Sequence, residues 1–264
     1  MSNAVSRIVV ALALLPVVLV AVYYGGWYVF AVVAIAAGVS LHEYWLLARP
    51  LAPLALAGYI GAALALVGAE ISGIAWMLGG VLATFVLAFL LKAISEAHQA
   101  ATIAISGTVM GAVWIGLGLG FLILLREIPD HGRLAVVTVL VAVWAGDTLA
   151  YMGGGLVGRH KMAPRTSPGK TWEGFVFGTA ATIFVAFVAL YKQHFLTIGQ
   201  SVVLGVVLAV AAPLGDLFES LLKRDMDVKD TGTLLGGHGG MLDRIDALLF
   251  AAPAAYFTIL AFTG

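Results

Sequence analysis

Nine apolar stretches of membrane-spanning length constrain this chain more than any other feature. About 20 apolar residues in a helix cross the hydrocarbon core of a bilayer. Of the 264 residues, 62% are hydrophobic and only 11% are charged, which is typical of polytopic membrane proteins. We therefore predict an all-α, polytopic integral membrane protein with about nine transmembrane helices. The predicted spans are residues 8–24, 27–48, 52–69, 74–92, 100–125, 134–156, 173–191, 200–222 and 245–262.

The lysines and arginines fall unevenly on the two sides of this nine-span arrangement. One side, which includes the N-terminus, receives 11 of the 14 cations, and the other receives only Arg126, Arg133 and Lys192. Cytoplasmic loops of membrane proteins carry the excess of positive charge. We therefore expect a protein of the cell inner (plasma) membrane, with its N-terminus and its long polar loops in the cytoplasm.

Two parts of the chain are expected to differ in role. Residues 1–130 hold the first five spans and are predicted to form a scaffold with homodimer contacts. Residues 131–264 hold spans six to nine together with the polar loops. The chain has no cysteine, which excludes disulfides and thiolate chemistry, and its net charge is zero. We expect no nucleic acid partner, since any basic surface must be local.

The segment from Ser220 to Asp246, called here the signature segment, gathers most of the strongly polar groups in the last third of the chain. Charges beside a bilayer are costly, so such a cluster indicates a functional site. Carboxylates are ligands for Mg²⁺, which keeps substrate phosphates in its shell. Lysine and arginine neutralise phosphate oxygens. The combination suits a site that holds a polyphosphate and its metal against a membrane.

A second polar segment runs from Asp147 to Gly174 and contains a Gly-Lys-Thr sequence at 169–171. A phosphate-binding P-loop is excluded, because its first glycine would fall at Pro164 and no strand precedes it. We expect Pro168 and Gly169 to break the chain, so that Lys170 and Thr171 open a helix whose N-terminus favours an anion.

Helical spacing brings further polar groups onto common faces. Asp216, Ser220 and Lys223 share one face of the eighth span, and Asp243 and Asp246 share a face at the start of the ninth. The first set aligns a carboxylate, a hydroxyl and an ammonium toward one ligand.

Both polar segments resemble the phosphatidate cytidylyltransferase family, also called the CDP-diacylglycerol synthase family. The matching positions of the signature segment are Ser220, Leu222, Lys223, Arg224, Lys229, Asp230, Gly232, His238, Gly239, Gly240, Met241, Asp243, Arg244, Ile245 and Asp246. Gly236 stands where many members carry proline. The matching positions of the earlier segment are Asp147, Ala150, Tyr151, Ser167, Pro168, Lys170, Thr171, Glu173 and Gly174.

The resemblance implies that CTP and phosphatidic acid react to give CDP-diacylglycerol and pyrophosphate, with the bilayer as the lipid's solvent. It implies that Asp216 and Asp243 bind Mg²⁺, and it leaves a second metal ion open. The expected catalytic residues are Lys223, Arg224, Lys229, Asp230, His238 and Asp246. The expected substrate-binding residues are Asp147, Ser167, Lys170, Thr171, Glu173, Ser220, Gly239, Gly240 and Arg244.

Three other functions were weighed against this one. A CTP-dependent polyprenol or phytol kinase also uses CTP in a membrane but lacks the complete signature. A CDP-alcohol phosphatidyltransferase needs an Asp-x-x-Asp-Gly-x-x-Ala-Arg element, which the chain lacks. A secondary transporter would show matching halves, and none is seen.

Several residues have a structural alternative. Arg159, Lys161 and Arg165 are either catalytic or simply anchors on the cytoplasmic side. His42 and Glu43 are expected to pair with each other or with another helix. The glycine pairs Gly107/Gly111 and Gly116/Gly120 are expected to allow close helix packing.

Overall fold

The computed structural model describes residues 3–95, 100–232 and 239–263, and it describes residues 3–13 as helical backbone only. His238, one of the expected catalytic residues, lies outside the described residues. The helices are α1 (Asn3–Tyr24), α2 (Trp27–Leu47), the 3₁₀ turn η1 (Arg49–Leu51), α3 (Ala55–Ser72), α4 (Ile74–Ala93), α5 (Ala101–Gly111), the π-helical η2 (Ala112–Leu117), α6 (Gly118–Arg126), α7 (Gly132–Val157), α8 (Trp172–Leu190), α9 (Ile198–Asp225) and α10 (Leu242–Thr263).

Eight stretches of the described chain are helical, long and apolar enough to cross a membrane. They are α2, α3, α4, the continuous run α5–η2–α6, α7, α8, α9 and α10. Within α1, the part from Leu14 to Tyr24 adds a shorter apolar stretch. The predicted helical, polytopic membrane architecture is confirmed. The helix α10 begins at Leu242, three residues before the predicted span, so Asp243 lies within its first turn.

The chain divides into two compact units. The first comprises Met1–Glu127 with Met226–Ile245, and the second comprises Ile128–Asp225 with Asp246–Gly264. Helix α10 is thus shared, because its first turn belongs to the first unit and the rest to the second.

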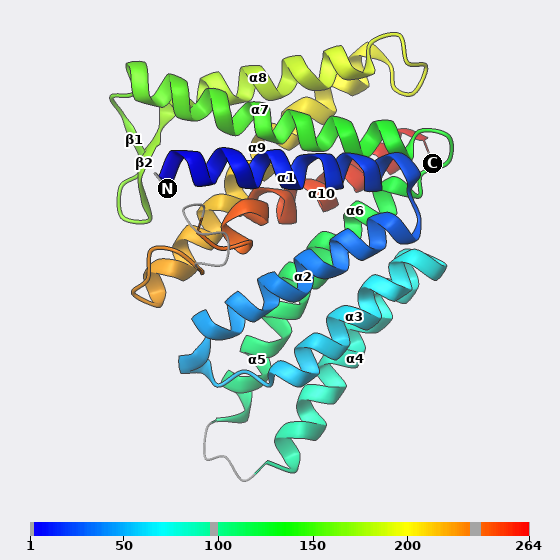
Figure 1. Ribbon diagram of the computed structural model, residues 1–264, viewed down its shortest axis with the longest axis vertical. Helices are drawn as coiled ribbons and strands as arrows, with labels where there is room; N and C mark the ends of the chain where they lie inside the picture. The colour runs from blue at the N-terminus through cyan, green and yellow to red at the C-terminus, as the bar shows by residue number, and fades with distance from the viewer. Residues whose placement is uncertain (1–2, 96–99, 233–238, 264) are drawn as a thin grey trace. The chain divides into compact units, whose positions relative to one another are not determined.

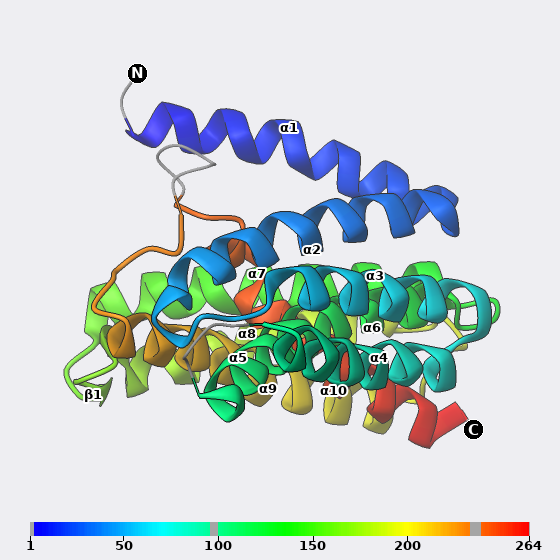
Figure 2. The ribbon, with the colours of Figure 1, turned by 90° about the horizontal axis from the view of Figure 1, so that it is seen from below.

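In the first unit, α3 and α4 lie side by side, as both ribbon views show (Figures 1 and 2). Their backbones approach closely because small residues face one another. A Cβ atom on Gly61 would collide with Thr84, and one on Gly80 would collide with the backbone of Ala65. Without a hydrophobic drive between helices in lipid, such close packing holds membrane helices together.

The run α5–η2–α6 is the most buried of the eight spans. A side chain at Gly111 would collide with Tyr44 and Trp45 of α2, and one at Gly116 would collide with Ala62 of α3. The expected packing role of these glycines is therefore confirmed. The Tyr44 hydroxyl adds a hydrogen bond by donating to the Gly107 carbonyl at 2.9 Å.

In the second unit, α7 packs along α8, and both contact α9 (Figure 1). Gly146 of α7 lies against Thr182 of α8, whose hydroxyl contacts the carbonyl oxygens of Gly178 and Ala142. Helices α9 and α10 touch at Gly215, where a Cβ atom would collide with the carbonyl oxygen of Asp246. This contact brings Asp246 of α10 close to the acidic residues of α9.

A short antiparallel hairpin interrupts the helices between α7 and α8, and the sequence did not predict it. Its strands are β1 (Lys161–Ala163) and β2 (Ser167–Thr171), with Lys161 opposite Thr171. Lys170 therefore lies in a strand rather than opening a helix. Helix α8 begins at Trp172, and the Thr171 hydroxyl caps it by accepting from the Gly174 N–H at 3.1 Å.

Candidate functional site

The Asp243 carboxylate organises the turn that leads into α10. Its Oδ2 accepts hydrogen bonds from the Thr231 N–H at 3.1 Å, the Thr231 hydroxyl at 3.0 Å and the Gly240 N–H at 2.8 Å. A carboxylate in the first turn of a helix also interacts favourably with the helix dipole. One carboxylate thus ties together the two described parts of the signature segment, through Thr231 of the first part and Gly240 of the second.

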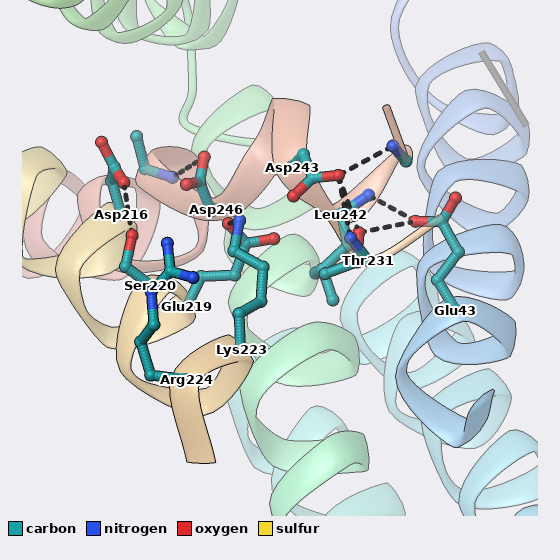
Figure 3. A network of polar contacts seen from close by, with 12 residues as sticks. Glu43, Asp216, Glu219, Ser220, Lys223, Arg224, Thr231, Leu242, Asp243 and Asp246 are labelled. Atoms are coloured by element: carbon teal, nitrogen blue, oxygen red, sulfur yellow. Dashed lines mark hydrogen bonds and ion pairs between the residues drawn. The ribbon is translucent and has the colours of Figure 1, made fainter. Parts of the chain in front are cut away.

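Glu43 of α2 holds the same turn from the other side, as Figure 3 shows. Its Oε1 accepts from the Met241 N–H at 2.9 Å, and its Oε2 accepts from the Leu242 N–H at 2.8 Å. The side chain is buried. The sequence allowed Glu43 to pair with another helix, but Glu43 was not one of the expected site residues. An acidic residue inside an apolar span was the available signal, and His42 beside it is exposed.

In the second unit, Asp216 of α9 joins two groups that the sequence had singled out. Its Oδ2 lies 2.8 Å from the Lys170 ammonium of β2. Its Oδ1 accepts from the Ser220 hydroxyl at 3.3 Å, as Figure 3 shows. The expected common face of Asp216 and Ser220 is confirmed. Lys170 also donates to the Pro213 carbonyl at 3.3 Å. The interaction thus combines a cation, a carboxylate and a hydroxyl at one place.

A buried ion pair lies one turn further along α9. The Lys223 ammonium is 2.8 Å from Glu219 Oε2, and the side chains are 11% and 1% exposed, so both charges are held away from water. Asp246 of α10 is buried as well, and its Oδ1 accepts from the Ala247 N–H at 2.8 Å. Glu219 was missed by sequence analysis, although its position four residues before Lys223 was a signal for a helical ion pair.

Two further contacts join the hairpin and α7 to this part of α9. Arg224 donates to the Thr166 carbonyl at 3.3 Å, which fastens the hairpin to the end of α9. Asp147 of α7 lies close enough to Asp216 and Lys170 for their charges to interact. Asp147, Lys170 and Asp216 are thus brought together from three elements that are distant in sequence.

Two of the expected substrate-binding residues, Thr171 and Glu173, make structural contacts at the start of α8. Thr171 is buried and caps the helix. Glu173 accepts hydrogen bonds from the N–H groups of Arg159 and His160 at 3.1 and 3.2 Å, and its other oxygen lies 2.6 Å from the His160 ring. Ser167 begins β2 and is half-buried.

The remaining expected residues are more accessible. Lys229, Asp230 and Arg244 are exposed. Gly239 has a φ of 79°, a left-handed conformation that favours glycine, and a Cβ atom there would crowd the Asp243 carboxylate. Glycine is therefore required at position 239, because only glycine combines that backbone angle with such a close approach.

The donor set fits a divalent cation in its chemistry, although no group of three or more histidine, aspartate or glutamate side chains in the described chain converges closely enough to hold one. Glu219 and Asp216 both lie close enough to Asp246 for their charges to interact. Two buried carboxyl groups this close repel each other when ionised, and a cation relieves that repulsion. Mg²⁺ binds few protein groups and takes its other ligands from water and substrate phosphates. Asp216 and Asp243 belong to different units, and their pairing around one metal stays a prediction.

Comparison with known proteins identifies the family. The sequence model of the Cytidylyltransferase family matches residues 5–262, which is nearly the whole chain. The chain belongs to the cytidylyltransferase family. The polar cluster of α9 and the hairpin in one unit, and that of the turn before α10 in the other, are thus the candidate functional groups of a cytidylyltransferase-family protein.

Three curated relatives of this cytidylyltransferase-family chain carry the same name. A phosphatidate cytidylyltransferase of Haemophilus influenzae is 42% identical over 130 residues, which are 47% of this chain and 45% of the relative. One of Mycobacterium bovis is 41% identical over 159 residues, 59% of this chain and 50% of the relative. One of Bacillus subtilis is 37% identical over 155 residues, 58% of each. The chain spans about half the length of the curated relatives it matches.

Proposed function

We propose that this protein transfers the cytidylyl group of CTP to phosphatidic acid, forming CDP-diacylglycerol and pyrophosphate in phospholipid synthesis. The observation that carries the proposal is the polar face of α9, where Asp216 contacts Lys170 and Ser220 at the end of an apolar helix. The substrates come from the names of the relatives. A polar site in apolar helices suits a lipid whose acyl chains stay in the bilayer.

In the proposed reaction, a phosphate oxygen of the lipid attacks the α-phosphorus of CTP. The new bond joins that oxygen to the α-phosphorus, and the bond from the α-phosphorus to the bridging oxygen breaks. Pyrophosphate leaves with the electron pair. The protein needs no covalent nucleophile, because positioning and charge neutralisation carry such transfers.

The cations of the two polar segments have distinct proposed tasks. Lys223, Arg224 and Lys229 hold the lipid phosphate or the departing pyrophosphate. Lys170 and Ser220 both contact the Asp216 carboxylate, and through it they orient the phosphate chain of CTP. Support for this assignment is that Lys170 reaches Asp216 from a hairpin that Arg224 also contacts.

Mg²⁺ is the proposed cofactor, with Asp216 and Asp243 as its carboxylate ligands and Asp246 nearby. When bound, it would neutralise the charge that develops on the triphosphate. Glu219 then keeps Lys223 in place beside this acidic group, which is supported by their 2.8 Å ion pair. We also propose that the N-terminus and both polar segments face the cytoplasm, where CTP is available, and that the protein forms a homodimer.

The test is an assay in mixed micelles of phosphatidic acid, with CTP labelled at either the α- or the γ-phosphate. We expect α-label in a lipid product and γ-label in pyrophosphate, and both to require Mg²⁺. A lipid-alcohol kinase would instead move γ-label to an added polyprenol. Transfer of γ-label to lipid, or no lipid product from phosphatidic acid, would refute the proposed function.

A further inference from the structure

We propose that Glu43 of α2 is a positioning residue, which holds the turn before α10 in the shape that fixes the position of the Asp243 carboxylate. The inference rests on the proposed function only for its kinetic consequence. Its structural part concerns the turn itself, in which Glu43 contacts residues nearly 200 positions later in the sequence.

Glu43 and Asp243 share the groups that they bind. Glu43 accepts the N–H groups of Met241 and Leu242, while Asp243 accepts the N–H of the preceding Gly240. Thr231 lies between them, 3.0 Å from Asp243 and 3.5 Å from Glu43 through its hydroxyl oxygen. A hydroxyl has one hydrogen to donate, and the shorter distance favours Asp243. Glu43 therefore acts on Asp243 through the backbone of the turn.

The glycines of the turn leave room for the Glu43 carboxylate. A Cβ atom on Gly232 would lie 2.7 Å from Glu43 Oε1, and one on Gly240 would lie 2.6 Å from Oε2. Neither glycine has a left-handed backbone angle, so close approach rather than backbone conformation excludes a side chain here. Two glycines of the signature segment thus pack on the same carboxylate.

A negatively charged side chain is favourable at the position of Glu43. The first N–H groups of a helix have no partner within the helix, and negative charge is favourable beside them. The chain offers only glycine and methionine at 240 and 241, which cannot cap α10 with their side chains. Within the described residues, none of the ion pairs involves Glu43, so backbone donors are what compensates its burial. A glutamine could accept only through its single oxygen.

The test compares Glu43→Gln with His42→Gln, a control at the neighbouring exposed position. Amide hydrogen exchange in detergent would be followed by mass spectrometry for peptides covering 239–245. In Glu43→Gln we expect faster exchange confined to this stretch. We also expect kcat to fall about 10- to 100-fold, as when a residue supporting a metal ligand is lost, with the KM for CTP unchanged and more Mg²⁺ needed for half-maximal rate. The control should match wild type in each respect.

A second variant, Gly232→Ala, reaches the same carboxylate without touching Asp243, and decides the matter if Glu43→Gln does not fold. It should give the same localised exchange and the same kinetic change. Exchange and kcat equal to those of His42→Gln would overturn the inference, as would faster exchange spread over all helices, which indicates a general loss of stability. If wild type transfers no cytidylyl group, the proposed function fails, and the exchange data alone judge the role of Glu43.

Discussion

Lys170 lies 2.8 Å from Asp216, so the hairpin between α7 and α8 is tied by an ion pair to the middle of α9's polar face. The same ammonium also donates to the carbonyl of Pro213, at 3.3 Å. The hairpin is therefore positioned by α9 and is not an independent surface loop.

Replacing Lys170 with alanine tests whether this contact serves the reaction. We expect kcat to fall about a hundredfold, since a charged group that meets phosphate in the transition state contributes on this scale. Lys161→Ala is the matched control, because Lys161 is an exposed cation on the same hairpin. Both variants would be assayed at saturating CTP. Equal rates for the two would remove Lys170 from the site.

Replacing Lys223 with methionine separates stability from chemistry. The change leaves Glu219 buried beside Asp246 without the cation that contacts it. Removing one partner of a buried pair typically costs about 3–5 kcal/mol, so the unfolding temperature in detergent should drop clearly. The double variant Glu219→Gln/Lys223→Met should recover most of that loss and yet stay inactive. An active double variant would show that Lys223 has a structural role only.

The sequence predicted the helices well because apolar length is a local property. It also predicted the contact between Asp216 and Ser220, since four residues along a helix bring side chains together. The hairpin was missed because β2 consists of Ser-Pro-Gly-Lys-Thr, which has no alternation and, apart from Thr171, no strand-forming residue. The hairpin is held against α9 by two contacts. Lys170 of β2 contacts Asp216, and Arg224 of α9 contacts the Thr166 carbonyl.

The role of Glu43 lay beyond sequence reasoning for a different reason. Its partners are backbone N–H groups of a turn almost 200 residues away in the sequence. Residue types do not reveal which backbone N–H groups a side chain contacts. The signals in the sequence were an acidic residue inside an apolar span and the glycines at 232 and 240. The pairing of Lys223 with Glu219, by contrast, is a local feature, because residues four positions apart on a helix lie side by side.

Single cysteines test the course of α7 through the membrane, since the chain has none of its own. Pro129 and Pro164 are exposed, uncharged and on either side of α7. We expect Pro164→Cys to react with a reagent confined to the cytoplasm, and Pro129→Cys to react only from outside. The positive-inside rule sets this direction. Labelling of both positions from one side would mean that α7 does not span the membrane.

The most direct test of the account is the rate of CDP-diacylglycerol formation by Asp216→Asn. The substitution keeps the size of the side chain but removes the charge that contacts Lys170 and is proposed to bind Mg²⁺. Asp225→Asn is its control, because Asp225 is an exposed aspartate at the end of the same helix. With labelled CTP and phosphatidic acid in micelles, we predict that Asp216→Asn loses at least about a hundredfold in kcat while Asp225→Asn keeps the wild-type rate. Asp216→Asn turning over as fast as Asp225→Asn would contradict the proposed site.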